Sequence, residues 1–133
     1  MKIEHIGIAV KSLAEAEKLY TILLKTPPYK RETVDSESVI TSFFHTGEAK
    51  IELLEATDEN SAIARHIDRR GEGIHHIAFE VTDIHEEMKR LKAEGFRLLN
   101  DFPKKGADNK LICFVHPKDC GGVLVEICQE IHE

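Results

Sequence analysis

The sequence lacks several features that mark particular classes of protein. It contains no apolar run near the roughly 18 residues that a membrane-spanning helix needs, and its first residues lack the apolar core of a secretory signal. Lysine and arginine (18) are outnumbered by aspartate and glutamate (24), so the formal net charge is −6 and no basic stripe stands out. We therefore expect neither a membrane nor a nucleic acid as a partner.

Cysteine is scarce as well. The three cysteines, Cys113, Cys120 and Cys128, show no metal-binding or redox spacing, and their odd number argues against a disulfide framework. Cys113 and Cys128 fall in apolar, strand-like segments, where we expect buried thiols. Free thiols of this kind are typical of a reducing compartment, so we expect a cytoplasmic protein.

An internal repeat organises the chain. Residues 5–10 (HIGIAV) are matched by residues 76–81 (HIAFEV), and residues 50–54 (KIELL) by residues 124–128 (LVEIC). Each half therefore opens on a strand that carries a histidine and closes on a strand that carries a glutamate. In both opening strands the histidine shares a face with small residues, and we expect the larger apolar residues on the opposite face to pack against a helix.

The segments between these strands give each half the same order of elements. Capping boxes at Ser12 and Asp83 predict two helices, and a short helix capped by Asn60 or Ser61 is expected to bridge the halves. The apolar stripes of the two capped helices are Leu13, Ala16, Tyr20 and Leu23 in the first and Ile84, Met88 and Leu91 in the second. Further strands are expected at 29–34, 39–44 and 49–54, and again at 97–100, 111–115 and 123–127.

This order predicts an α+β fold of two β-α-β-β-β modules related by a pseudo-twofold. The length of 133 residues suits one domain with a proper core. We expect residues 1–133 to form a single domain, with module one at about 1–56, a bridging helix at about 57–72 and module two at about 73–130.

Four residues, His5, Glu52, His76 and Glu126, occupy matching places on matching strand faces of the two halves. A lone strand histidine is most often structural, but the repetition favours a shared metal site, and a carboxylate in an apolar strand needs a partner. Two imidazoles and two carboxylates suit a divalent transition ion such as Zn, Ni, Co or Mn better than Ca or Mg. Four protein ligands on an octahedral ion leave two positions for a substrate.

The remaining polar residues carry weaker signals. Lys118, in the glycine-rich turn of residues 117–122, is a candidate for binding an anionic substrate group. His75 falls on the face opposite His76 and is expected to be structural. The other histidines expected in turns, helix surfaces or the tail are His45, His66, His85 and His132.

Four stretches resemble the vicinal oxygen chelate superfamily, which includes glyoxalases, bleomycin-resistance proteins and ring-cleaving dioxygenases. They are residues 5–10, 59–64 (ENSAIA), 71–81 (GEGIHHIAFEV) and 116–126 (HPKDCGGVLVE). The last stretch is the most specific and is similar to the methylmalonyl-CoA epimerase family. The resemblance covers nearly the whole chain and implies a glyoxalase-like, cupped mixed sheet around the metal site. It also implies cobalt as the common ion and a homodimer.

The resemblance further implies an activity, the interconversion of (R)- and (S)-methylmalonyl-CoA through a metal-stabilised enolate. It implies that Glu126 moves the C2 proton on one face of the substrate. Thr41 stands where some relatives have a glutamate for the other face, and so is expected to line the substrate. The phosphates of an acyl-CoA call for cations, and the candidates are Lys104, Lys105, Lys110 and Lys118.

Other functions share this ligand set. Glyoxalase I (lactoylglutathione lyase), which acts on a glutathione hemithioacetal, resembles the chain in having two histidines and two glutamates. A non-catalytic ligand-binding protein on the same scaffold is a further alternative, although relatives of that class usually lack the metal set. A ring-cleaving dioxygenase uses two histidines and one carboxylate on Fe(II), so the fourth ligand disfavours it. The stretch 116–126 favours the epimerase.

Overall fold

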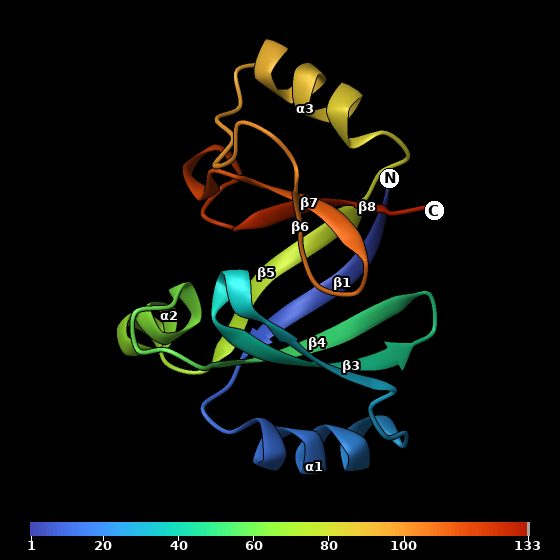
Figure 1. Ribbon diagram of the computed structural model, residues 1–133, viewed down its shortest axis with the longest axis vertical. Coiled ribbons are helices and arrows are strands. Elements are labelled where there is room, and N and C mark those ends of the chain that lie inside the picture. The colour runs from blue at the N-terminus through green and yellow to red at the C-terminus, as the bar shows by residue number, and fades with distance from the viewer. Residues whose placement is uncertain (133) are drawn as a thin grey trace. The chain divides into compact units, whose positions relative to one another are not determined.

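The structure, a computed structural model, describes residues 1–132 and divides into two compact units. The first unit is His5–His75, and the second joins Met1–Glu4 to the chain from His76 onward. Figure 1 shows the helices and strands of both units, coloured along the chain. None of the helices in residues 1–132 is long and apolar enough to cross a membrane.

The chain runs twice through one order of elements. The first module contains β1 (Lys2–Ala9), α1 (Leu13–Leu24), β2 (Lys30–Val34), β3 (Val39–Thr46) and β4 (Ala49–Ala56). The second contains β5 (Gly73–Glu80), α3 (Ile84–Ala93), β6 (Lys104–Lys105), β7 (Lys110–Val115) and β8 (Val125–Glu130). Between the modules lies α2 (Ala62–Arg70), and the short 3-10 turns are η1 (Asp35–Glu37) and η2 (Pro117–Asp119). This repetition confirms the predicted α+β fold of two β-α-β-β-β modules, whereas the single domain stays a prediction.

The strand order is the same in the two modules when each is read from its outer strand: β2-β3-β4-β1 in the first and β6-β7-β8-β5 in the second. The histidine strand pairs in parallel with the glutamate strand in both cases, β1 with β4 and β5 with β8. The other pairs within each module are antiparallel. Gly7 lies opposite Glu52 and Ala78 lies opposite Glu126, so each histidine stands two residues before the position that faces its glutamate.

One face of each module packs against its helix. The side chains of Ser12 and Asp83 accept the predicted hydrogen bonds from the backbone N–H groups of Glu15 and Glu86, which fixes the start of α1 and of α3. The core beneath α1 is formed by Val10, Leu13, Ala16, Phe44 and Leu53. The core beneath α3 is formed by Ile84, Met88, Leu91, Cys113, Val115 and Ile127. Because side chains alternate along a strand, the opposite face of each module carries the candidate ligands.

The predicted stripe of α1 was wrong at its last position. Leu23 is 65% exposed, and Leu24 packs on the core beside Tyr20 instead. At 3.6 residues per turn, Leu24 returns to the face of Leu13 after about three turns, whereas Leu23 falls short of it.

The strand predicted at 97–100 was also wrong. That segment forms only one isolated bridge, Leu98 to Val115, and the edge strand is instead the short β6. The reason is visible at Asn100, whose side-chain oxygen accepts a hydrogen bond from the backbone N–H of Phe114 (3.0 Å). The Asn100 side chain therefore accepts the hydrogen bond from β7 that a backbone carbonyl would accept in a regular strand.

The burial of β5 differs from the expectation for its faces. His76 and Ala78 are 3% and 0% exposed, while Ile77 and Phe79 on the larger apolar face are only half-buried. The cause is that α3 packs mainly on β7 and β8 rather than on β5. The histidine-bearing face is thus the better protected one.

The thiols lie where the sequence pattern predicts them. Cys113 and Cys128 are buried in β7 and β8, and Cys120 is half-buried. Burial raises the pKa of all three thiols, which leaves little thiolate at neutral pH.

Truncation of Leu53 tests the core beneath α1. Leu53 is fully buried, so Leu53→Ala should lower the free energy of unfolding by about 2–5 kcal/mol. The matched control Leu23→Ala removes the same atoms from an exposed site and should change it by less than about 0.5 kcal/mol. Urea unfolding followed by circular dichroism measures both, and equal losses would return Leu23 to the core.

Candidate metal centre

The first half-site consists of His5 on β1 and Glu52 on β4. The parallel register sets both side chains on the face opposite α1, and they are only 5% and 4% exposed. His5 Nε2 lies 3.5 Å from Glu52 Oε1. Removing polar side chains such as these from water costs free energy unless they have partners. This buried pair is therefore the unusual feature of the module.

The second half-site repeats this arrangement with His76 on β5 and Glu126 on β8. The two residues are 3% and 4% exposed, and His76 Nε2 lies 3.6 Å from Glu126 Oε1. The ring of Phe114 meets the His76 imidazole edge-on, with ring centroids 6.0 Å apart. This contact fixes the plane of the imidazole that carries the donor nitrogen.

A phenylalanine lies opposite each glutamate in both modules, a feature that was not predicted from the sequence. Phe43 on β3 faces Glu52, and Phe114 on β7 faces Glu126. Phe43 is 1% exposed and Phe114 is half-buried, so an apolar residue lies across from each carboxylate. The signal was present as a phenylalanine in the third strand of each half, but it becomes readable only once the strand register is known.

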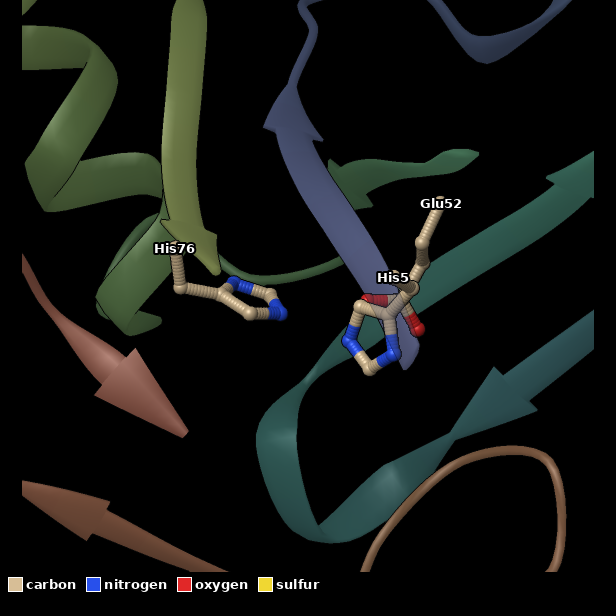
Figure 2. Close-up of side chains that lie close together, drawn as sticks. All are labelled: His5, Glu52 and His76. Carbon is tan, nitrogen blue, oxygen red and sulfur yellow. The ribbon is translucent and has the colours of Figure 1, made fainter. Parts of the chain in front are cut away.

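Three of the four predicted donors are close enough to serve one ion, and Glu126 is not among these three. His5, Glu52 and His76 each offer one ligand atom, and these atoms lie within 4.8 Å of one another (Figure 2). His76 follows directly on the last residue of the first unit. The separations of 3.5 and 3.6 Å inside the half-sites are at or beyond the limit of a hydrogen bond.

These separations have a simple explanation in coordination chemistry. Two donors that each lie about 2.1 Å from a common ion are about 3.0 Å apart at a right angle and about 3.4 Å apart at the tetrahedral angle. The observed imidazole–carboxylate separations of 3.5 and 3.6 Å are slightly longer than both values, so an ion can fit between the two groups. Together with the mixed nitrogen and oxygen donors, this fits a divalent transition ion.

The two residues predicted to bind substrate lie in different surroundings. Thr41 on β3 is 1% exposed and shares the face of Phe43, and its hydroxyl donates to the backbone carbonyl of Glu32 (3.2 Å). Lys118 is exposed in η2. Their roles toward a substrate stay predictions.

The turn that carries Lys118 is held from both sides. The Lys118 backbone N–H donates to Nδ1 of His116 (3.1 Å), and Arg97 pairs with Asp119 at 2.9 Å. Hydrogen bonds from Arg97 lower the pKa of the Asp119 carboxyl to about 2, so this anchor is charged throughout the neutral range.

Two other histidines make contacts of a structural kind. The ring of His75 meets that of His66 edge-on at 4.9 Å, and His45 stacks on Tyr29 at 3.8 Å. His75 therefore serves a different contact from its neighbour His76, in line with its place on the other strand face.

Known proteins resemble this chain over nearly its whole length. The profile of the glyoxalase/bleomycin resistance protein/dioxygenase superfamily matches residues 4–114. The ethylmalonyl-CoA/methylmalonyl-CoA epimerase of Cereibacter sphaeroides is 38% identical over 130 residues, which cover 96% of this chain and 97% of the relative. The human mitochondrial methylmalonyl-CoA epimerase is 36% identical over 129 residues, which cover 96% and 73%.

A solved structure shows the same likeness in three dimensions. A variant of the methylmalonyl-CoA epimerase of Streptomyces coelicolor, in complex with 2-nitronate-propionyl-CoA, superposes with a TM-score of 0.95. It is 32% identical, and the match covers 99% of each chain.

Replacement of His76 tests the metal centre. His76→Ala removes one donor, so the affinity for Co²⁺ should fall by more than about 100-fold, the upper range for loss of a residue that merely supports a ligand. The matched control His75→Ala removes the adjacent imidazole and should leave the affinity near that of the unchanged protein. Titration calorimetry on EDTA-treated protein measures both, and an unchanged affinity in His76→Ala would contradict the assignment.

Proposed function

Since the chain belongs to the glyoxalase/bleomycin resistance protein/dioxygenase superfamily, we propose that it interconverts (R)- and (S)-methylmalonyl-CoA in a metal-dependent reaction. The observation that carries this proposal is the pair of buried half-sites, His5–Glu52 and His76–Glu126. They occur in a chain that matches a methylmalonyl-CoA epimerase and an ethylmalonyl-CoA/methylmalonyl-CoA epimerase over 96% of its length. Fold and donor set thus support the same activity.

We assign His5, Glu52, His76 and Glu126 as ligands of one divalent ion, with cobalt as the first choice and zinc, nickel or manganese as alternatives. When bound, such an ion acts as a Lewis acid and favours negative charge on the thioester oxygen. The protein's part is to hold the donors in place. Phe43 and Phe114 lie across from the two carboxylates, and we propose that they limit the access of water there, which strengthens electrostatic interactions.

Glu126 is proposed as the acid/base group on one face of the substrate. Epimerisation requires that the C2 proton leave on one face and that a proton return on the other, with a planar enolate between the two steps. Oε1 of Glu126 lies 3.6 Å from Nε2 of His76. The group serving the second face is not Thr41, because its hydroxyl donates to Glu32 and threonine is a poor base. We propose that Thr41 lines the substrate.

The substrate class implies further contacts. An acyl-CoA carries phosphates, for which the exposed Lys118 is a proposed partner. We also propose a homodimer, for which α1 offers the exposed apolar side chains of Leu19 and Ile22. Light scattering checks this directly, and a monomeric mass would overturn it. The three free cysteines agree with the proposed cytoplasmic location.

Glyoxalase I is the second candidate, because it resembles this chain in its ligand set of two histidines and two glutamates. The deciding experiment follows exchange of the C2 proton of methylmalonyl-CoA with deuterated water by NMR, with cobalt-loaded protein and an EDTA-treated control. A parallel sample receives methylglyoxal and glutathione. Metal-dependent exchange at C2 alone supports the epimerase, and isomerisation of the glutathione adduct alone makes the protein a glyoxalase. Binding of methylmalonyl-CoA without turnover in either sample would make it a ligand-binding protein.

The role of Glu126 has its own test. Glu126→Gln keeps the shape of the side chain but removes the base, so the exchange rate at C2 should fall by about 10²- to 10⁴-fold. Glu130→Gln, an exposed glutamate on the same strand, is the matched control and should keep the rate. The cobalt content of both variants is measured so that loss of the base is separated from loss of the ion. A near-normal rate in Glu126→Gln would move the base elsewhere.

A further inference from the structure

A buried lysine lies on the same sheet face as the second half-site. Lys110 begins β7 and is 5% exposed. Along β7, Cys113 and Val115 point into the core beneath α3, so Lys110 shares the opposite face with Ile112 and Phe114. Phe114 contacts His76, and Ile112 packs with Ala78 and Cys128.

The pseudo-symmetry of the modules shows that this lysine is exceptional. Phe43 and Phe114 are equivalent, since each faces a ligand glutamate. Four residues earlier on the same strands stand Val39 and Lys110, which face Ala56 and Glu130. The first module fills this corner with an apolar cluster of Ala9, Val39, Leu54 and Ile63, and Ile63 comes from α2. The second module places Lys110, Cys128 and Glu80 at the corresponding positions.

Lys110 has no ion pair of its own among the described residues. Its Nζ donates one hydrogen bond, to the backbone carbonyl of Asp108 (3.3 Å). Within residues 1–132 no carboxylate pairs with it: its cross-strand neighbour Glu130 is exposed, and Glu80 is paired with Lys2. A buried ammonium that has one neutral acceptor is costly. Such a group is retained where an anion joins it.

The charge of Lys110 acts on a thiol beside the second half-site. Burial raises the pKa of the Cys128 thiol, Glu126 and Glu4 raise it further, and Lys110 opposes them. The ammonium therefore belongs to the same electrostatic neighbourhood as Glu126. Lys110 lies four residues before Phe114, about 13 Å along the strand, so its long side chain serves ligand atoms other than the C2 atom assigned to Glu126.

We propose that Lys110 binds an anionic oxygen group, carboxylate or phosphate, of the acyl-CoA substrate. This inference rests on the proposed function. The ammonium has two N–H donors beyond the one given to Asp108, enough to hold such a group by charge-assisted hydrogen bonds. Lys110 takes no part in the transfer of the C2 proton. Its loss should therefore weaken substrate binding and leave the rate of the chemical step unchanged.

The experiment compares cobalt-loaded wild-type protein with Lys110→Met, which keeps an unbranched side chain one atom shorter and removes the charge. KM for methylmalonyl-CoA should rise about 10- to 100-fold, the effect of one hydrogen bond to a charged group, with kcat changed far less. Lys110→Arg should restore most of the affinity. The exposed Lys89→Met on α3 is the matched control and should keep both constants.

A second substrate identifies the anion. Methylmalonyl-pantetheine carries the carboxylate but none of the nucleotide phosphates of CoA. If the Lys110→Met defect persists with it, Lys110 binds the acyl carboxylate; if the defect disappears, Lys110 binds a phosphate. Unchanged KM values with both substrates would overturn the inference.

Thermal melting separates binding from a structural role. Removal of an unpaired buried charge should leave the melting temperature of Lys110→Met equal or higher, whereas a lower melting temperature with unchanged KM would assign Lys110 to the fold and overturn the inference. Absence of turnover by wild-type protein would overturn the proposed function instead. Calorimetric titration with methylmalonyl-CoA then measures the affinity directly. About 10-fold weaker binding by Lys110→Met than by wild-type protein supports the inference. Equal affinities of the two proteins, or no binding by the wild-type protein, would overturn it.

Discussion

Four candidate metal ligands removed from water are the constraint on which the rest of this structure depends. An isolated buried charge costs several kcal/mol even after relaxation, and two carboxylates with two imidazoles cannot be hidden without partners. Both modules solve this in one way. A parallel strand pair sets each histidine two residues before the position that faces its glutamate, so the two groups share one face. The apolar cores beneath α1 and α3 lie on the other face and supply the stability that the polar face does not.

Much of this arrangement was predictable from sequence, because it is written in repeats and local signals. The matching histidine and glutamate strands were readable in the two halves, and the capping residues Ser12 and Asp83 marked the helix starts. What could not be predicted depends on contacts between segments. The phenylalanines opposite the glutamates require the strand register, and the loss of the strand at 97–100 depends on Asn100 reaching Phe114. Whether Leu23 or Leu24 faces the core depends on the exact rotation of the helix about its axis, which the sequence pattern did not resolve.

The most informative positions are those where the two modules differ. Val39 and Lys110 are equivalent in register but opposite in chemistry, as are Thr41 and Ile112. α2 contributes Ile63 to the apolar corner of the first module. Polar residues hold the corresponding corner of the second. The shared features thus carry the candidate metal ligands, and the differences carry the residue proposed to recognise the substrate.

The duplicated layout also bears on how such a protein could arise. Each module carries one complete imidazole–carboxylate pair, so a half-length ancestor that associated with a copy of itself would already have owned all four donors. In that ancestor any residue on the donor face would have appeared twice, and a lysine gained at one corner would have been gained at both. Fusion into one chain removes this restriction. In one chain, one half can keep a valine while the other acquires a cation, so the two halves of a symmetric scaffold can differ in charge.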